Sequence, residues 1–148
     1  MLPLSPDRLE SIWSLFDNAH VARRHSVLPV EKLQHKRSLT ETMSIYREHA
    51  CDLGRQVAQR CLAEADVAPG EVDLVITVSC TGIMIPSLDA YLANDLGFRP
   101  DVRRMPLTEL GCVGGAAALG LARDFLVGHP EANVLIVTVE LPSLSFQK

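Results

Sequence analysis

The sequence predicts an α/β fold in which a mostly parallel sheet is flanked by helices. Two segments, 72–79 and 133–141, are apolar at consecutive positions, which is typical of strands that are covered on both faces. Helical segments alternate with these strands along the chain. The 148 residues are enough for a core of their own, so we expect a single domain over residues 1–148.

The amino-terminal segment is predicted to begin with a helix. Ser5 followed by Pro6 indicates an N-cap with proline at the first helical position. The apolar face of this helix consists of Leu9, Ile12, Trp13 and Phe16. Residues 21–28 are expected to be extended and basic, and residues 29–35 to form a short helical turn.

A long helix is predicted next, capped by Ser38 or Thr40 and running towards Ala65. Two of the four cysteines, Cys51 and Cys61, lie inside it among apolar residues. Buried cysteines usually act as small apolar side chains, so packing accounts for both and we assign them no chemistry.

The second half is predicted to alternate strands and helices. After the strand 72–79, Ser87 caps a helix that stops at Gly97, and residues 102–107 form a short strand. A helix of small residues then spans 112–127 and leads to the last strand. His129 is interpreted as a helix-end residue that interacts with the carboxyl-terminal dipole.

One cysteine lies between glycines where a loop leads into this Ala-rich helix. Glycine permits a tight turn and the close approach of another backbone. The unpaired N–H groups at a helix start favour a thiolate and could hold a developing oxyanion. We therefore predict that Cys112 is a nucleophile for acyl transfer. The alternative is that Cys112 packs as a small apolar side chain, as most unpaired cysteines do.

Charge and cysteine spacing exclude several other functions. The formal net charge is −4, and the basic pairs at 23–24 and 103–104 do not form a stripe, which argues against general nucleic-acid binding. The four cysteines show no CxxC spacing and no paired histidines, so we expect no metal site, no disulfide framework and a cytoplasmic location. No apolar run is long enough to cross a bilayer, so no membrane contact is expected.

Several motifs carry a family resemblance. They are Val72-Asp73-Leu74-Val75, Ser79-Cys80-Thr81-Gly82, Leu96-Gly97-Phe98-Arg99-Pro100, Gly111-Cys112-Val113-Gly114-Gly115 and Val139-Glu140-Leu141. In order and spacing they resemble the amino-terminal half of type III polyketide synthases, the chalcone and stilbene synthase-like enzymes. The likeness extends more weakly back through residues 21–25, so it covers essentially the whole chain.

The resemblance implies a partial thiolase-like fold, one half of a duplicated α/β sandwich. It also implies that Cys112 takes an acyl group from a CoA thioester and that a carbanion from decarboxylated malonyl-CoA then lengthens this group as a polyketide. No cofactor is implied, because acyl-CoA and malonyl-CoA are the substrates.

Other site residues follow from the same resemblance. Arg23 and Arg24 match a segment that places basic side chains against the CoA phosphates, although a solvated surface pair explains them equally. Cys80 and Thr81 match positions that line the acyl cavity, with simple packing as the alternative for Cys80. Ile85 matches a residue that reaches across a contact in the family homodimer.

The chain departs from the family in what it lacks. The family's general base and oxyanion partner are a histidine and an asparagine from the carboxyl-terminal half, and the chain ends at Lys148 before that half begins. Five histidines are present and none lies in a matching motif: His20, His25, His35, His49 and His129. We therefore expect an incomplete member, either a truncated gene product or an incomplete gene model, that is catalytically impaired alone.

The family's first strand is also missing from the sequence. We expect that strand centrally in the sheet, between segments 72–79 and 133–141, so that its absence leaves apolar edges which invite association.

Two rival functions stay open. A ketoacyl-carrier-protein synthase III-like enzyme shares the fold and the cysteine helix, although residues 79–82 and 139–141 look more like the polyketide branch. A non-catalytic dimerisation fragment would use its apolar helix and strands only to pair with a full-length relative.

Overall fold

A computed structural model describes residues 5–33 and 35–145. Within these ranges, three strands form one parallel sheet in the order β2–β1–β3. They are β1 (Val72–Val78), β2 (Arg103–Leu107) and β3 (Asn133–Thr138). The register places Ile76 of β1 opposite Met105 on one side and Ile136 on the other. The predicted α/β class with a parallel sheet is confirmed.

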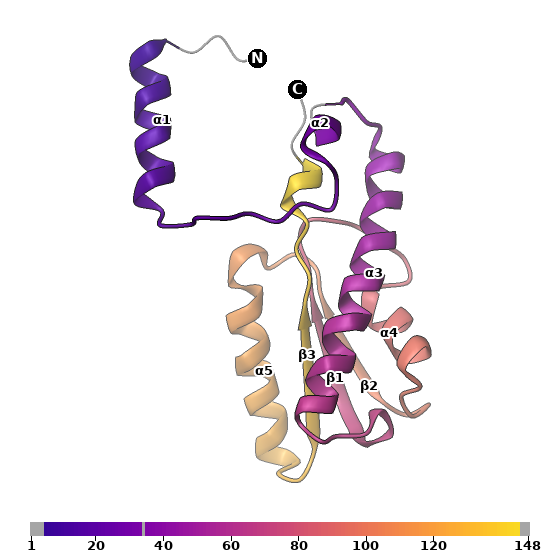
Figure 1. Cartoon of the computed structure of the whole chain (residues 1–148). Coiled ribbons are helices and arrows are strands. Elements are labelled where there is room, and N and C mark those ends of the chain that lie inside the picture. The colour runs from indigo at the N-terminus through magenta and orange to yellow at the C-terminus, as the bar shows by residue number, and fades with distance from the viewer. Residues whose placement is uncertain (1–4, 34, 146–148) are drawn as a thin grey trace.

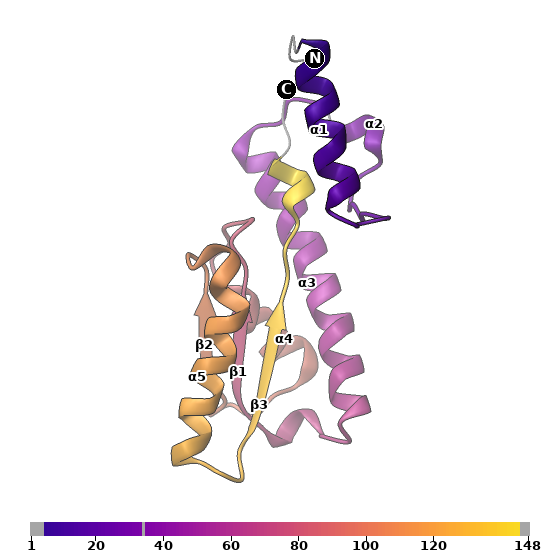
Figure 2. The ribbon, with the colours of Figure 1, turned by 90° about the vertical axis from the view of Figure 1, so that its left-hand side faces the viewer.

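Helices cover both faces of the sheet (Figure 1). On one face lie α3 (Leu39–Glu64) and α4 (Leu88–Leu96), and on the other lies α5 (Gly114–Gly128). Figure 2 shows α5 in front of the strands and α3 behind them. Because successive strand residues point to opposite faces, β1 is buried on both, as its continuous apolar sequence predicts.

The core therefore has two parts. Leu74 and Ile76 of β1 pack with Ala118 and Ala122 of α5. Val75 lies in the larger cluster on the opposite face, beneath α3 and α4. The side chains that α3 and α4 contribute to that cluster are Tyr46, Ala50, Ala58, Leu62, Leu88 and Leu92.

Local signals in the sequence set the helix ends. Ser38 caps α3 through a capping box, in which its hydroxyl accepts from the Glu41 amide and the Glu41 carboxylate accepts from the Ser38 amide. Gly97 ends α4 with φ of 69°, a left-handed conformation that suits glycine. Both boundaries agree with the prediction.

The arrangement of the last strand differs from the prediction. β3 ends at Thr138, and the predicted strand residues 139–141 follow it as irregular chain. β1 and β3 pair directly, so the expectation of a strand missing between them is wrong. The pairing is continued beyond β3 by the Val139 amide, which donates to the Val78 carbonyl at 3.0 Å. In the described part of the chain, the unpaired edges are the outer edges of β2 and β3.

The first helix, α1 (Pro6–Asn18), forms as predicted but buries none of its residues. Trp13 is 66% exposed and Phe16 55% exposed, and their rings contact each other at a centroid distance of 6.1 Å. Figures 1 and 2 show α1 set apart from the sheet, joined to it by an extended arm and the short helix α2 (Val30–Leu33). The apolar face expected here is present, but no residue within 5–33 and 35–145 buries it.

The two cysteines of α3 differ from each other. Cys51 is partly buried against the larger core cluster, as predicted. Cys61 is exposed and lies with Val57 in a shallow groove beside the outer edge of β3, so the packing explanation is wrong for Cys61. β3 is an edge strand, and the described residues include no further strand beyond it to cover this side of α3.

Candidate active site

The residues singled out by the sequence gather where the three parallel strands end. Cys80 follows β1, Cys112 follows β2, and Glu140 follows β3. Loops at the carboxyl ends of parallel strands meet at one edge of the sheet, where α/β proteins place their ligand sites. The fold thus brings together segments that are about 30 residues apart in sequence.

Cys112 lies in the 3₁₀ turn Gly111–Val113, directly before α5. The α-helix itself begins at Gly114, two residues later than predicted. Gly111 adopts φ of 58°, which a non-glycine residue rarely does, and this turns the chain into the helix. The Cys112 side chain is exposed rather than packed, which removes the alternative interpretation of a buried apolar cysteine within this chain.

Gly114 fixes this turn against the sheet. A Cβ atom at Gly114 would lie 2.6 Å from Cγ1 of Val78, the last residue of β1. The close approach therefore requires glycine. At Gly115 a Cβ atom would meet nothing within 4 Å, so only one of the two adjacent glycines is sterically required.

Glu140 holds the loop that carries Cys80 and Thr81. Its Oε1 accepts from the Cys80 amide at 2.9 Å. Its Oε2 accepts from the Thr81 amide at 3.1 Å and from the Thr81 hydroxyl at 2.6 Å. The same hydroxyl oxygen accepts from the Leu141 amide at 2.8 Å. The chain after β3 is thereby tied to the chain after β1.

Tyr46 of α3 holds the same loop from below. Its hydroxyl donates to the Ser79 hydroxyl at 2.6 Å, and its ring lies against Gly82 so closely that any Cβ there would overlap the ring. Tyr46 is 1% exposed, and burial raises the pKa of its phenol, with the nearby Glu140 charge adding to the shift. The phenol therefore remains a hydrogen-bond donor at neutral pH.

Cys80 is disfavoured as a thiolate. Interaction with the Glu140 carboxylate, which accepts from the Cys80 amide, is the largest cause that raises the pKa of the Cys80 thiol, and partial desolvation and the neighbouring Cys112 raise it further. Cys80 and Gly111, the residue before Cys112, line the same cavity, so the two cysteines belong to one part of the molecule.

An open cavity lies beside these thiols. Its lining residues are Cys80, Gly82, Ile83, Met84, Ile85, Thr108, Glu109 and Gly111. Cys80 and Ile85 thus line one cavity next to the Cys112 turn, although the sequence predicted a cavity-lining position only for Cys80 and Thr81. Thr81 is absent from the lining and serves instead in the Glu140 network. Ile85 is 93% exposed, which leaves its side chain available to a partner.

Arg23 and Arg24 lie outside this cavity. They are exposed residues of the arm between α1 and α2, and neither forms an ion pair with another described side chain. Figures 1 and 2 place the arm at the same end of the molecule as the start of α5. The structure therefore brings the arginines to the correct end of the sheet without bringing them to the cavity.

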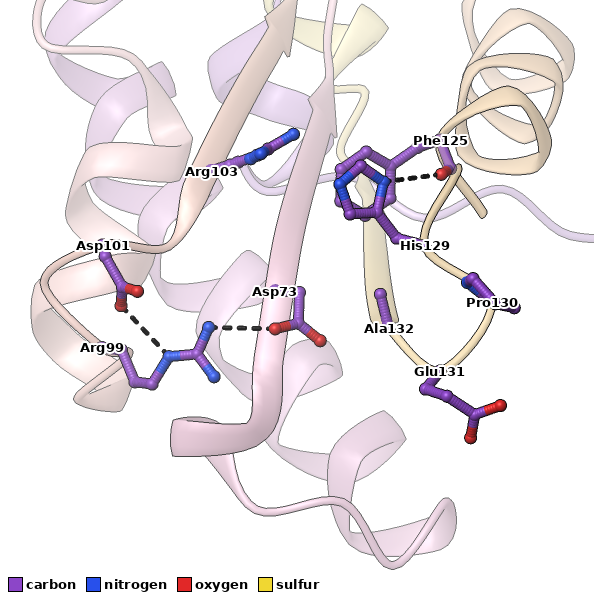
Figure 3. A pocket seen from close by; sticks show the side chains of 9 residues that line it. All are labelled: Asp73, Arg99, Asp101, Arg103, Phe125, His129, Pro130, Glu131 and Ala132. Carbon is purple, nitrogen blue, oxygen red and sulfur yellow. Dashed lines mark hydrogen bonds and ion pairs between the residues drawn. The ribbon is translucent and has the colours of Figure 1, made fainter. Parts of the chain in front are cut away.

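A second cavity opens at the amino ends of the strands (Figure 3). Arg99 pairs there with Asp73 at 2.9 Å and with Asp101 at 3.1 Å. The His129 ring stacks on Phe125 with centroids 4.3 Å apart, and Nδ1 of His129 lies 3.1 Å from the Phe125 carbonyl oxygen. This contact confirms His129 as a helix-end residue.

Asp73 fastens the start of β3 to β1 in this second cavity. Its carboxylate accepts from the Asn133 amide at 2.8 Å as well as from Arg99. These hydrogen bonds lower the pKa of Asp73, the Asn133 amide having the largest effect and Arg99 the next. Within residues 5–33 and 35–145, no group of three or more His, Cys, Asp or Glu side chains could hold a metal ion.

Glu140 is the site residue that sequence reasoning missed. The motif 139–141 contributed to the family resemblance, but no role was assigned to its acid. An acidic residue directly after a buried strand was the available signal. Its partners, Cys80 and Thr81, lie about 60 residues away in sequence, so only the parallel pairing of β1 with β3 reveals them.

Comparison with known proteins identifies the family. Residues 8–148 match the family model of the N-terminal domain of chalcone and stilbene synthases. The chain belongs to this family. It is 43% identical over 136 residues to 1,3,6,8-tetrahydroxynaphthalene synthase of Streptomyces griseus, an alignment that covers 92% of this chain and 37% of that protein. It is 37% identical over 130 residues to phloroglucinol synthase of Pseudomonas fluorescens, covering 88% of this chain and 37% of the relative.

Solved structures of family members agree. The crystal structure of 1,3,6,8-tetrahydroxynaphthalene synthase from Streptomyces coelicolor, a bacterial type III polyketide synthase, superposes with a TM-score of 0.90 at 38% identity. The match covers 97% of this chain and 41% of that one. This confirms the thiolase-like fold and the predicted resemblance to the amino-terminal part of such enzymes. The chain spans about two fifths of the length of the relatives it matches.

One helical stretch of this family member, Gly111–Gly128, is long and apolar enough to meet the length and composition criteria for a membrane span. By length and composition, the expectation that no apolar run is long enough for a bilayer is therefore wrong. Ala118 and Ala122 of this stretch pack against β1, whereas Leu119 and Val127 are exposed.

Proposed function

We propose that this chain provides the acyl-accepting part of a type III polyketide synthase. In this proposal Cys112 is acylated by an acyl-CoA and the acyl group is extended by units derived from malonyl-CoA. The observation that carries it is the exposed Cys112, set between Gly111 and Gly114 at the start of α5 beside the cavity that Cys80 lines. Membership of the family supports the reaction class.

The chemistry follows from the sulfur and the helix start. The Cys112 sulfur attacks the thioester carbonyl, the tetrahedral oxyanion collapses, and CoA leaves as its thiolate with the acyl group now on Cys112. The positive end of the α5 dipole lies at this turn and stabilises negative charge there. Malonyl-CoA then loses CO₂, and its carbanion attacks the acyl carbonyl to give a β-ketoacyl-CoA and free Cys112.

The second stage requires groups that the sequence does not supply. The family resemblance assigns a base and an oxyanion partner to a histidine and an asparagine that match no position here. We therefore expect this chain alone to accept an acyl group on Cys112 without sustained release of polyketide. Acylation of Cys112 and release of the polyketide can therefore be measured separately.

Substrate and partner contacts complete the proposal. Arg23 and Arg24, exposed on the arm at the same end as α5, are proposed to bind the CoA phosphates by charge-assisted hydrogen bonds. Ile85, 93% exposed at the cavity, is proposed to contact a second copy in a homodimer. No cofactor is needed beyond the two CoA thioesters, and a cytoplasmic location is proposed from the cysteine usage.

The purified chain can be tested directly with a starter acyl-CoA. We expect mass spectrometry of peptides to find the acyl adduct on Cys112, and Cys112→Ser to abolish it. Equal acylation of the serine variant, or an adduct confined to Cys61, would overturn the proposal. Adding malonyl-CoA then measures release: steady release of polyketide would show that the chain is sufficient alone. A preference for acetyl-CoA and acyl carrier protein would instead favour the ketoacyl synthase III class.

A non-catalytic interaction module is the second candidate, because Trp13 and Phe16 of α1 are left exposed by the part of the chain that the structure describes. On that interpretation Cys112→Ser leaves the biological effect intact. Association with a full-length relative, measured by sedimentation, would then depend on Trp13→Ala and not on Cys112.

A further inference from the structure

The loop between β1 and α4 is held from two sides. Ser79 and Gly82 face Tyr46 in the core, while Cys80 and Thr81 are bonded to Glu140 above it. Each of the first four residues of this loop, 79–82, therefore contacts either Tyr46 or Glu140. Glu140 is the member of this arrangement that carries charge and directly contacts the thiol loop.

We propose that Glu140 is a positioning residue that fixes the Cys80 loop beside the Cys112 turn and ensures that Cys112, rather than Cys80, accepts the acyl group. This inference rests on the proposed function, because it concerns the choice between two thiols for the same acyl donor. Neither the family match nor the names of the relatives assign this role.

Two neighbouring thiols present a selectivity problem. A thiolate at either sulfur can attack a CoA thioester, forming a carbon–sulfur bond and releasing the CoA thiolate. An acyl group on Cys80 would be attached to the loop between β1 and α4 instead of to the turn that begins α5. Suppressing the Cys80 thiolate prevents this side reaction and requires no change at Cys112.

Glu140 is suited to that task by geometry. Both its carboxylate oxygens are directed at the loop by three hydrogen bonds, so the charge cannot turn away from Cys80. A fixed negative charge opposes a second negative charge on the sulfur next to it. The other titratable groups around Cys80 are Cys112, Tyr46 and the cavity residue Glu109. Of the two acids near Cys80, only Glu140 is hydrogen-bonded to the loop within the described residues.

The test measures alkylation of Cys80 by iodoacetamide as a function of pH in a Cys112→Ser background, read by peptide mass spectrometry. We expect Glu140→Gln to increase the rate at pH 7.5 about tenfold, because removing the neighbouring negative charge lowers the pKa of the Cys80 thiol. In the acylation assay with Cys112 present, the same substitution should move part of the acyl label to Cys80.

Two variants serve as controls. Glu109→Gln also removes one negative charge, here from the cavity that Cys80 lines, without breaking a hydrogen bond to the loop. The pH profile of Cys80 alkylation should therefore stay unchanged. Thr81→Val keeps the Glu140 charge but removes the bridging hydroxyl, so it should speed amide hydrogen exchange at residues 80–82 and leave the alkylation midpoint within a few tenths of a pH unit.

Several outcomes overturn the proposal. An unchanged Cys80 profile in a folded Glu140→Gln variant would do so, as would an equal response to Glu109→Gln. If Glu140→Gln does not fold, the profile of Cys80 in the Cys112→Ser chain decides alone, since a midpoint at or below about 8.5, that of a free cysteine, contradicts the suppression. Alkylation needs no CoA chemistry, so failure of the proposed function would appear only in the acylation assay.

Discussion

The two ends of the sheet use polar side chains in different ways. At the amino ends of the strands, Arg99 lies between Asp73 and Asp101, so that each of these two carboxylates has a cationic partner. At the carboxyl ends, Glu140 has no cationic partner among the described residues and binds backbone amides and a hydroxyl instead. The first arrangement fastens β3 to β1. The second holds the loop that follows β1 and keeps the Glu140 carboxylate, without a cationic partner among the described residues, near Cys80 and Cys112.

This difference shows what makes one end suitable for chemistry. The same three strands begin at one cluster and end at the other, so the strands alone do not decide which end is suited to chemistry. Parallel strands send their loops and the start of α5 to the carboxyl end, which brings unpaired amide groups and Cys112 there. Substitutions at the carboxyl end should therefore change reactivity, in some cases together with stability, whereas those at the amino end should change stability alone.

The largest effect is expected for the sulfur itself. Cys112→Ser should reduce acylation at this position at least about a hundredfold, because a hydroxyl is a far weaker nucleophile than a thiolate. The exposed side chain makes few packing contacts, so the thermal unfolding midpoint should stay within about 1 °C. Cys61→Ser, which alters another exposed cysteine, is the matched control and should leave Cys112 acylation unchanged.

Gly114→Ala should cost stability at the carboxyl end. The added Cβ would lie 2.6 Å from the Val78 side chain, and relieving such overpacking costs about 1–3 kcal/mol in the free energy of unfolding. Because the turn must shift, acylation of Cys112 should fall as well. Urea unfolding checks the first expectation and acylation the second.

The adjacent Gly115→Ala is the control for that variant. A Cβ there meets nothing within 4 Å, and alanine is favoured over glycine in a helix by about 1 kcal/mol, so stability should be unchanged or increased. Equal destabilisation by both variants would contradict the steric explanation.

A smaller effect is expected for Tyr46→Phe. The substitution removes a buried hydrogen bond of 2.6 Å to Ser79 and keeps the ring against Gly82, which should cost about 1–2 kcal/mol. Hydrogen exchange should become faster in the loop 79–82 before it does elsewhere. Tyr91→Phe, at a partly buried tyrosine of α4, should cost less than half as much.

The smallest effect is expected at the amino end and depends on pH. The hydrogen bonds from Asn133 and Arg99 lower the pKa of Asp73 in the folded chain, so its stabilising effect is present above the ordinary carboxyl pKa of about 3.9 and is lost as pH falls through the lower folded value. The stability difference between the parent and Asp73→Asn should therefore shrink below pH 4.

Urea unfolding between pH 2.5 and 7 measures this dependence. Asp124→Asn, which alters an exposed ion pair between adjacent residues, should show no comparable trend. Acylation of Cys112 at neutral pH should be the same in both variants. A loss of acylation in Asp73→Asn would remove the distinction between the two ends.

Local sequence signals were sufficient for most elements. Ser38 and Gly97 mark helix ends through their own side chain or backbone conformation, and the apolar run of β1 reports burial on both faces. The glycine-flanked Cys112 was recognisable for the same reason, because its special turn depends on adjacent residues. Such features need no knowledge of the rest of the chain.

Features that join distant segments were not predictable in this way. The direct pairing of β1 with β3 contradicted the expected order, and the contact of Glu140 with Thr81 spans 59 residues. The exposure of Trp13 and Cys61 was missed because an apolar pattern shows that a face requires burial without showing what covers it. Sequence patterns therefore show which faces are apolar, and only the fold shows which segments pack against them.

The order of the strands also constrains how the chain acquires its structure during synthesis. The central strand β1 is made well before β3, its last partner, and Val139, Leu141 and Leu144 are needed to complete the cluster beneath α3. Until residue 144 has left the ribosome, one apolar side of α3 stays in contact with water or with chaperones. A ribosome pause before residue 144 emerges would therefore prolong the stage at which this nascent polypeptide is most prone to aggregate.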